Sequence, residues 1–282
     1  MLEVRAYQAY DDAAELEIQV SAFGRRSLQT LDRFIGLVGE RATEESETTL
    51  ALLLDRVKLE STTLLQQASG LPDHVACECQ SYERYSDLFL AHHNMTRGHL
   101  GVDESVWERD VQTYVLQTRL ARAHYVPRYL MVKALVEVEG RERGVDLMKQ
   151  FLDSEITRLP RPTSPPESII ELRRRDIPWN LDDKGQDAIS ALVSEHQCLK
   201  KVTACRTHKV LEPYGDPDLM EVVACYPDYA SMRRTNEHFA LTRTQTLING
   251  GDYCDTCFHD TRFVLDFVHP TRDVFESLEA CL

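Results

Sequence analysis

The chain has 282 residues, of which 43% are hydrophobic and 28% are charged, and this balance is typical of a globular protein. Its formal net charge of −14 argues against a nucleic-acid partner, because binding to a phosphate backbone needs a basic field. No stretch reaches the roughly 18 apolar residues that span a bilayer, so no membrane partner is expected.

The first twenty residues lack both the basic segment and the apolar run of a secretory signal peptide. We therefore expect a cytoplasmic protein. In that compartment the eight cysteines are expected to be free thiols, metal ligands or catalytic groups rather than disulfides. Five of them lie between Cys198 and Cys257, which directs attention to the C-terminal part.

The N-terminal half shows apolar residues at helical spacing. This spacing predicts a helical stretch over residues 27–69 and further helices over residues 82–96, 104–125, 128–139 and 141–158. Residues 159–168, LPRPTSPPES, hold four of the eleven prolines. They are predicted to be a connector, because proline disrupts a helix interior.

The C-terminal part, residues 169–282, mixes both kinds of element. Strands are predicted over residues 198–205, 219–225 and 241–248, one strand or two joined by a bend over residues 256–268, and a helix over residues 226–240. Strands this short usually pair as antiparallel neighbours. We therefore expect an α+β fold, in which a helical region, residues 1–158, packs on a small antiparallel sheet with helices. Because the connector is short, one compact body is expected.

The stretch NGGDYCDTCFHD, residues 249–260, combines thiols, a histidine and carboxylates behind a double glycine. Cys254, Cys257 and His259 have the spacing of a zinc knuckle, which would make zinc a cofactor. A structural zinc site normally has a second pair of ligands, and the sequence lacks one. The main expectation is therefore a site without a metal.

A cysteine nucleophile is the alternative. Cys225 precedes a predicted helix start, where the helix dipole would lower the pKa of the thiol. Cys254 follows Gly250 in a tight turn and has Asp255 and His259 close by in the sequence, so acid and base groups are near. For each thiol taken singly, a buried cysteine without chemistry remains open.

Arg243 lies between threonines in a predicted strand. An arginine in that position either pairs with a buried carboxylate or binds the carboxylate of a substrate. The sequence leaves both possibilities open.

From Cys205 to His259 the chain resembles the L-2-amino-thiazoline-4-carboxylic acid hydrolase family. The helices around residues 130–152 resemble that family more loosely. The matching pieces are Cys205 after a strand, VVACYPD with Cys225 and Asp228, and LTRTQTLINGGDYCD with Arg243, Thr244, Thr246, Gly250, Cys254 and Asp255.

The resemblance implies a hydrolase that opens a C–N or C–S bond in a small cyclic carboxylate. A thiol would attack an amidine-like carbon or position a water, and neighbouring groups would move protons. The catalytic residues implied are Cys225, Cys254, Asp255, Asp228 and His259. The substrate-binding residues implied are Arg243, which would hold the carboxylate, with Thr244, Thr246 and Gly250.

Two other functions stay open. An isomerase or cyclase of a secondary-metabolite pathway would use the same scaffold without adding water. A helical interaction protein with a zinc-stabilised C-terminal module belongs to a different class. Residues 1–118 match nothing in the family, and they would either reshape the pocket or form a homodimer through the N-terminal helices.

Overall fold

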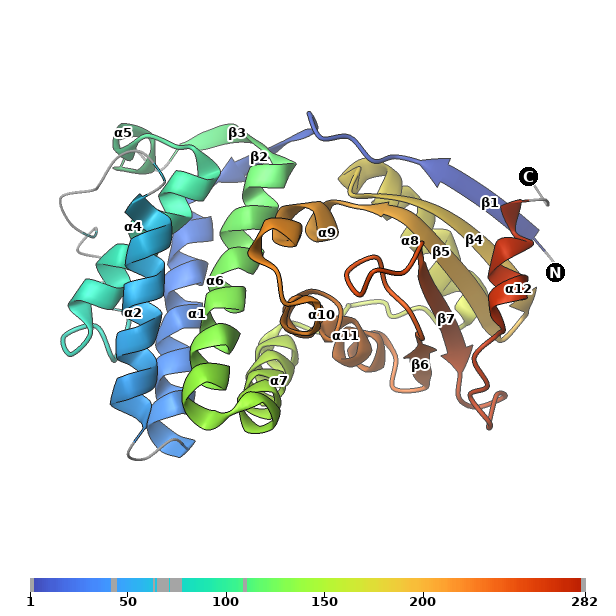
Figure 1. The fold of residues 1–282 in the computed structure, drawn as a ribbon. Helices are drawn as coiled ribbons and strands as arrows, with labels where there is room; N and C mark the ends of the chain where they lie inside the picture. The colour runs from blue at the N-terminus through green and yellow to red at the C-terminus, as the bar shows by residue number, and fades with distance from the viewer. Residues whose placement is uncertain are drawn as a thin grey trace. The chain divides into compact units, whose positions relative to one another are not determined.

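The computed structural model describes residues 3–41, 45–62, 64, 71, 78–108 and 111–279 (Figure 1). The chain divides into two compact units. The sheet unit comprises Met1–Asp12 and Ile156–Leu282, and the helical unit comprises Ala13–Glu155. The predicted boundaries at residues 158 and 168, and the single compact body, stay predictions.

The helical unit is built around α4 (Ser86–Leu100), which has buried residues on nearly all sides. It packs against α1 (Val20–Arg41), α2 (Ser46–Thr62) and α6 (Gln117–Glu139), as Figure 1 shows. The other elements are α5 (Glu104–Glu108), α7 (Arg141–Arg158) and an antiparallel pair, β2 (Glu15–Gln19) and β3 (Gln112–Leu116). No helix in the described part of the chain is long and apolar enough to cross a bilayer.

The predicted apolar spacing explains the burial of α1. Leu28, Leu31, Phe34 and Ile35 recur along one side of the helix and are all buried. Phe34 meets Phe151 of α7 edge to face, with ring centroids 5.4 Å apart. The helix predicted over residues 141–158 is confirmed as α7. The helical stretch predicted over residues 27–69 consists of two helices, α1 and α2. Of the residues that follow α2, residues 63 and 65–69 lie outside the described part of the chain.

Two predicted helices of this unit have wrong bounds. Residues 104–125 contain α5, β3 and the first turns of α6 rather than one helix. The β-branched and aromatic residues of Gln112–Leu116 pair with β2, and this pairing prevails over the helical spacing. Pro127 lies inside α6 among buried residues such as Val126 and Tyr129, so the helix predicted to start at residue 128 starts at Gln117 instead.

The sheet unit centres on one antiparallel sheet of order β1-β4-β5-β7-β6. Its strands are β1 (Glu3–Gln8), β4 (Gln186–Ser194), β5 (Gln197–Cys205), β6 (Phe239–Thr242) and β7 (Cys254–Asp260). Its helices are α8 (Ile169–Asp183), α9 (Arg206–Leu211), the 3₁₀ turn η1 (Glu212–Tyr214), α10 (Pro217–Ala224), α11 (Pro227–Thr235) and α12 (Arg272–Glu276). The predicted α+β class is confirmed, with the difference that residues 3–8 contribute an edge strand rather than helix.

Side chains of the sheet alternate between two faces, which are covered by different segments. On one face, Ile169 of α8 packs with Leu192. On the other face, Phe275 of α12 packs with Leu199 and Cys257. These are called the α8 face and the α12 face below. Consecutive residues of one strand therefore have different surroundings.

Three predicted strands of the C-terminal part also need correction. Residues 219–224 belong to the helix α10 and Cys225 caps its end, because the side chain of Asp216 accepts from the N–H of Leu219 over 3.4 Å and Pro217 occupies the first turn. A short apolar run fits helix and strand equally well, which explains the error. The strand predicted over residues 241–248 ends at Thr242, and the one over residues 256–268 ends at Asp260.

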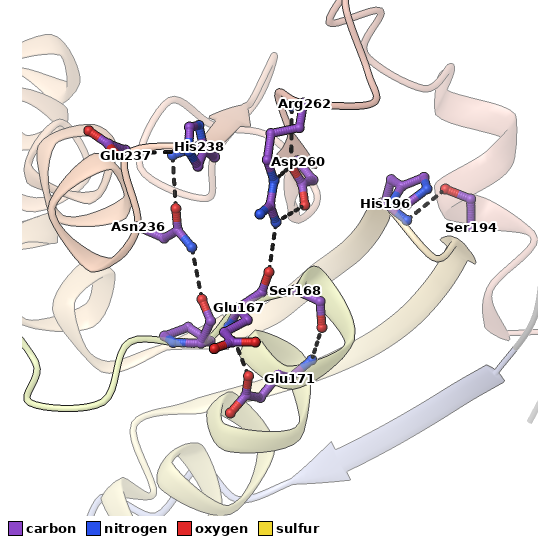
Figure 2. Close-up of polar contacts among 11 residues, drawn as sticks. Glu167, Ser168, Glu171, Ser194, His196, Asn236, Glu237, His238, Asp260 and Arg262 are labelled. Atoms are coloured by element: carbon purple, nitrogen blue, oxygen red, sulfur yellow. Dashed lines mark hydrogen bonds and ion pairs between the residues drawn. The ribbon is translucent and has the colours of Figure 1, made fainter.

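The Pro-rich connector ends in polar contacts with the sheet unit (Figure 2). The side-chain amide of Asn236 donates to the carbonyl oxygen of Pro166 over 2.9 Å, and Arg262 donates to that of Glu167 over 2.7 Å. Arg262 is itself bound by the buried carboxylate of Asp260 at 2.6 Å. Residues 159–168 contain no helix or strand, as predicted, and their end is fixed just before α8 begins.

Three buried histidines of α4 make the helical unit sensitive to acid. Burial lowers the pKa of His92 to about 4, that of His93 to about 3 and that of His99 to about 4, from the usual 6.5. The unfolded chain therefore binds protons first as the pH falls. Above pH 6.5 these residues cost the folded protein no stability. As the pH falls from 6.5 toward 4, the free energy of unfolding decreases by on the order of 3 kcal/mol for each histidine.

Between about pH 7 and pH 4.5, the free energy of unfolding should fall in both proteins. We expect the fall to be about 2 kcal/mol smaller in His93→Leu than in the parent protein. Urea unfolding at both pH values, followed by circular dichroism and by tryptophan fluorescence, measures the difference. His93 meets Trp107 edge to face, so the fluorescence reports on this region. The exposed His238→Leu is the control. A parent-like pH dependence in His93→Leu would contradict the assignment.

Candidate active site

Arg243 is the buried cation of the candidate site. Its Nε donates to Oγ1 of Thr256 on β7 over 2.9 Å, and its Nη2 donates to Oδ2 of Asp228 on α11, also over 2.9 Å. The arginine side chain is 9% exposed and that of Asp228 is 50% exposed, so the pair joins a buried cation to an anion that faces solvent. Burial alone would lower the pKa of Arg243, but the anionic neighbours, Asp228 first, raise it above its usual value.

Three cysteines lie in the neighbourhood of this ion pair. Cys205 ends β5, Cys225 lies between α10 and α11, and Cys254 begins β7. Cys225 and Cys254 are close enough to each other, to Cys205 and to Arg243 for their charges to interact. The backbone N–H of Leu247 donates to Sγ of Cys254 over 3.3 Å. The structure thus brings together residues from four separate segments of the chain.

Burial keeps the thiols of Cys225 and Cys254 protonated at neutral pH. It raises the pKa of Cys225 well above the usual value and that of Cys254 from 9 to about 11. The predicted lowering of the Cys225 pKa by a helix dipole is therefore wrong. Cys225 ends α10 as well as preceding α11, so the negative end of one helix opposes the positive end of the other.

Strand β7 sends the predicted catalytic residues to opposite faces of the sheet. Cys254 packs on the α8 face, the side of Arg243, whereas Cys257 packs in the core of the α12 face. By the same alternation Asp255 and His259 belong to the α12 face. Cys254, Asp255 and His259, which the sequence groups together, are therefore separated.

The zinc-knuckle set of Cys254, Cys257 and His259 is divided between the same two faces. Within the described ranges, no three histidine, cysteine, aspartate or glutamate side chains converge as metal ligands. Burial raises the pKa of Cys257 to about 12, and this thiol packs as a small apolar side chain among core residues.

Asp255 holds the segment that follows Arg243. Its buried carboxylate, 4% exposed, accepts from the backbone N–H of Thr244 over 2.8 Å and from that of Gln245 over 2.9 Å. The hydroxyl of Thr244 donates to the other carboxylate oxygen. The backbone N–H of Asp255 donates to the carbonyl oxygen of Gln245 over 3.3 Å. The carboxylate is thus occupied by hydrogen bonds to the turn.

Thr246 and Gly250, predicted to bind substrate, shape the rest of this turn. The buried Oγ1 of Thr246 accepts from the N–H of Asn249 over 3.1 Å, and its carbonyl oxygen accepts from the N–H of Gly251 over 2.9 Å. Gly250 has φ of 78°, a conformation that favours glycine. Substrate contacts by Thr244, Thr246 and Gly250 stay predictions.

His259 is buried within the sheet unit. Its Nε2 lies 2.8 Å from Oγ1 of Thr242, and its Nδ1 lies 3.2 Å from the side-chain nitrogen of Gln197. The ring therefore has polar partners on both sides and belongs to the α12 face. Its predicted role as a proton carrier stays a prediction.

Two residues that the sequence did not single out contribute to these surroundings. Thr256 anchors Arg243, and His269 places its Nε2 3.1 Å from Oδ2 of Asp255. His269 lies in the irregular segment after β7, where no periodic pattern marks it. Only the return of that segment to the sheet brings its ring beside Asp255, so local sequence could not have indicated it.

Comparison with known proteins supports the resemblance. Residues 121–258 match the family model described as L-2-amino-thiazoline-4-carboxylic acid hydrolase. The matched residues run from α6 into β7 and include Cys225, Arg243, Cys254 and Asp255. Neither a curated protein nor a solved structure matches the chain. The predicted resemblance is confirmed, and residues 121–258 carry a domain of the L-2-amino-thiazoline-4-carboxylic acid hydrolase family.

Proposed function

We propose that this protein is a hydrolase that opens a C–N or C–S bond in a small cyclic carboxylate, with Arg243 binding the carboxylate and Cys254 attacking the ring. The family of the matched domain is named for such a hydrolase. The observation that carries the proposal is the buried Arg243, held by Thr256 and by a half-exposed Asp228, with thiols beside it.

Arg243 binds a substrate carboxylate by exchanging it for Asp228. The bond from Nε to Thr256 keeps the guanidinium in place when Asp228 leaves. The side chain of Asp228 is half exposed, so its charge stays solvated at the edge of the site after it releases the guanidinium. A carboxylate that replaces it gains charge-assisted, bidentate hydrogen bonds in a largely buried place, and these are strong.

The thiol then attacks the ring. Sγ of Cys254 forms a bond to the amidine-like carbon while its proton passes to the released Asp228. The ring C–N or C–S bond breaks, and the leaving atom takes that proton. Water next attacks the same carbon, the S–C bond breaks, and the thiol regains a proton. The net reaction consumes one water and needs neither oxidant nor reductant.

A non-hydrolytic isomerase or cyclase is the second candidate, and one observation favours it. Burial keeps Cys225 and Cys254 protonated, so both can act as proton donors without any covalent step. Turnover in ¹⁸O-labelled water separates the two candidates. A hydrolase puts labelled oxygen into the product, and an isomerase or cyclase does not.

Loss of the guanidinium should weaken substrate binding. With L-2-amino-thiazoline-4-carboxylic acid as the probe, we expect Arg243→Gln to raise KM by about 10- to 100-fold, the range for losing a charge-assisted pair. Asp228→Asn should instead lower KM, because it removes the competing anion, and should reduce kcat, because it removes the proton acceptor. Steady-state kinetics on both variants gives these numbers.

Arg233→Gln, at an exposed position of α11, is the matched control for loss of a positive charge. It should leave KM unchanged. A parent-like KM in Arg243→Gln would exclude Arg243 as the carboxylate-binding residue.

Removal of the Cys254 thiol should stop the covalent step. We expect Cys254→Ala to lower kcat by at least about 100-fold, a typical cost for losing a nucleophile. Cys257→Ala, on the opposite face of the same strand, should retain parent kcat once its folding is verified by circular dichroism. Turnover that survives in Cys254→Ala would remove this residue from the mechanism.

The raised pKa of Cys254 predicts slow alkylation at neutral pH. Because only the thiolate reacts, the rate with iodoacetamide should rise about tenfold per pH unit and level off near pH 11, the pKa of the folded protein. Mass spectrometry of the peptide that contains Cys254 measures this rate. In the denatured chain the alkylation rate of Cys254 should level off near pH 9. If the rate in the folded protein levelled off below pH 9, Cys254 would be a thiolate near neutral pH and the raised pKa would be contradicted.

A further inference from the structure

Thr242, the residue before Arg243, is fixed by two histidines. Its Oγ1 lies 2.8 Å from Nε2 of His259 and 2.8 Å from Nδ1 of His269. A hydroxyl has one proton to give, so it accepts from one ring and donates to the other. His269 in turn stacks on Phe275 of α12, with ring centroids 5.4 Å apart and 15° between planes, and this contact orients the imidazole.

Thr244, the residue after Arg243, is fixed by Asp255, which accepts from both its N–H and its hydroxyl. The same carboxylate lies 3.1 Å from Nε2 of His269. One imidazole ring therefore touches the groups that hold both neighbours of Arg243. The guanidinium itself points away from that ring, to Thr256 and the α8 face.

The hydrogen bonds among Gln197, His259, Thr242 and His269 all have the same donor-to-acceptor direction. The side-chain amide of Gln197 donates to Nδ1 of His259, so a neutral His259 carries its proton on Nε2 and donates to Thr242. The Thr242 hydroxyl then donates to Nδ1 of His269, which leaves the proton of that ring on Nε2, the nitrogen that lies 3.1 Å from Oδ2 of Asp255. Burial, the largest cause, lowers the pKa of His259, in agreement with a neutral ring.

We infer that His269 is a positioning residue for carboxylate binding: it joins Thr242 to Asp255 and thereby fixes the backbone on both sides of Arg243. The inference rests on the proposed function for the identity of Arg243 as the binding residue. His269 lies outside residues 121–258, so the family match does not account for it. A misaimed guanidinium weakens binding of the carboxylate, whereas the thiols on the other segments keep their places.

Two probes separate positioning from a general loss of structure. One is L-2-amino-thiazoline-4-carboxylic acid, and the other is the same aminothiazoline ring without the carboxylate. For His269→Gln we expect KM for the first probe to rise about tenfold, and kcat/KM for the second to stay within about twofold. Thr242→Ser should keep parent kinetics because it keeps the hydroxyl. Thr242→Val, which matches threonine in shape, should behave like His269→Gln. His238→Gln, at an exposed histidine, is the control.

A readout without turnover tests the link itself. Hydrogen exchange of the backbone amides of Thr244 and Gln245, both bound by Asp255, should become at least about tenfold faster in His269→Gln and stay unchanged in His238→Gln. Nitrogen NMR of the parent protein should show His259 and His269 both protonated on Nε2.

The outcomes distinguish this inference from the proposed function. If Arg243→Gln leaves KM unchanged, the proposed function fails, yet faster exchange in His269→Gln would still support the link. If Arg243→Gln raises KM while His269→Gln changes neither KM nor exchange, the inference is overturned and the function stands. An equal loss on both probes would show a general structural role for His269 and would also overturn the inference.

Discussion

A single buried carboxylate, that of Asp255, allows the chain to leave the sheet beside the candidate site. When β6 ends at Thr242, the N–H groups of Thr244 and Gln245 lose their strand partners, and unpaired buried N–H groups are costly. Asp255 accepts from both at 2.8 and 2.9 Å, and these hydrogen bonds also compensate for burying its charge. The turn and its carboxylate stabilise each other, and Arg243 begins the segment that they fix.

The alternation of side chains along β7 divides the work between two faces of one sheet. Asp255 and His259 lie among fixed polar contacts on the α12 face, where both are buried. Cys254 lies on the α8 face with the Arg243–Asp228 pair, whose anion reaches solvent. Rigid support is therefore separated from the groups that can exchange partners. A reacting site needs this separation, because it must be held in place and still admit a ligand.

The sequence indicated the α+β class, the connector and the residues of the family motif, because each leaves a local signal: apolar period, proline content and residue spacing. It could not indicate the turn after Thr242. Thr242, Thr244 and Thr246 alternate as in a strand, and the carboxylate that ends the strand comes from the next strand of the sheet. The sequence could not indicate the raised pKa of Cys225 either, since burial, which depends on the folded chain, is its largest cause.

The family match ends at Phe258, one residue before His259 and well before His269. It therefore covers the cation and the thiols but not the histidines that support them from the α12 face. If His269 positions Arg243 as inferred, substitutions on that face would change the direction of Arg243, whereas Cys225 and Cys254 are held by other contacts. Under the proposed function, such a chain would alter which carboxylate it accepts while it keeps Cys225 and Cys254.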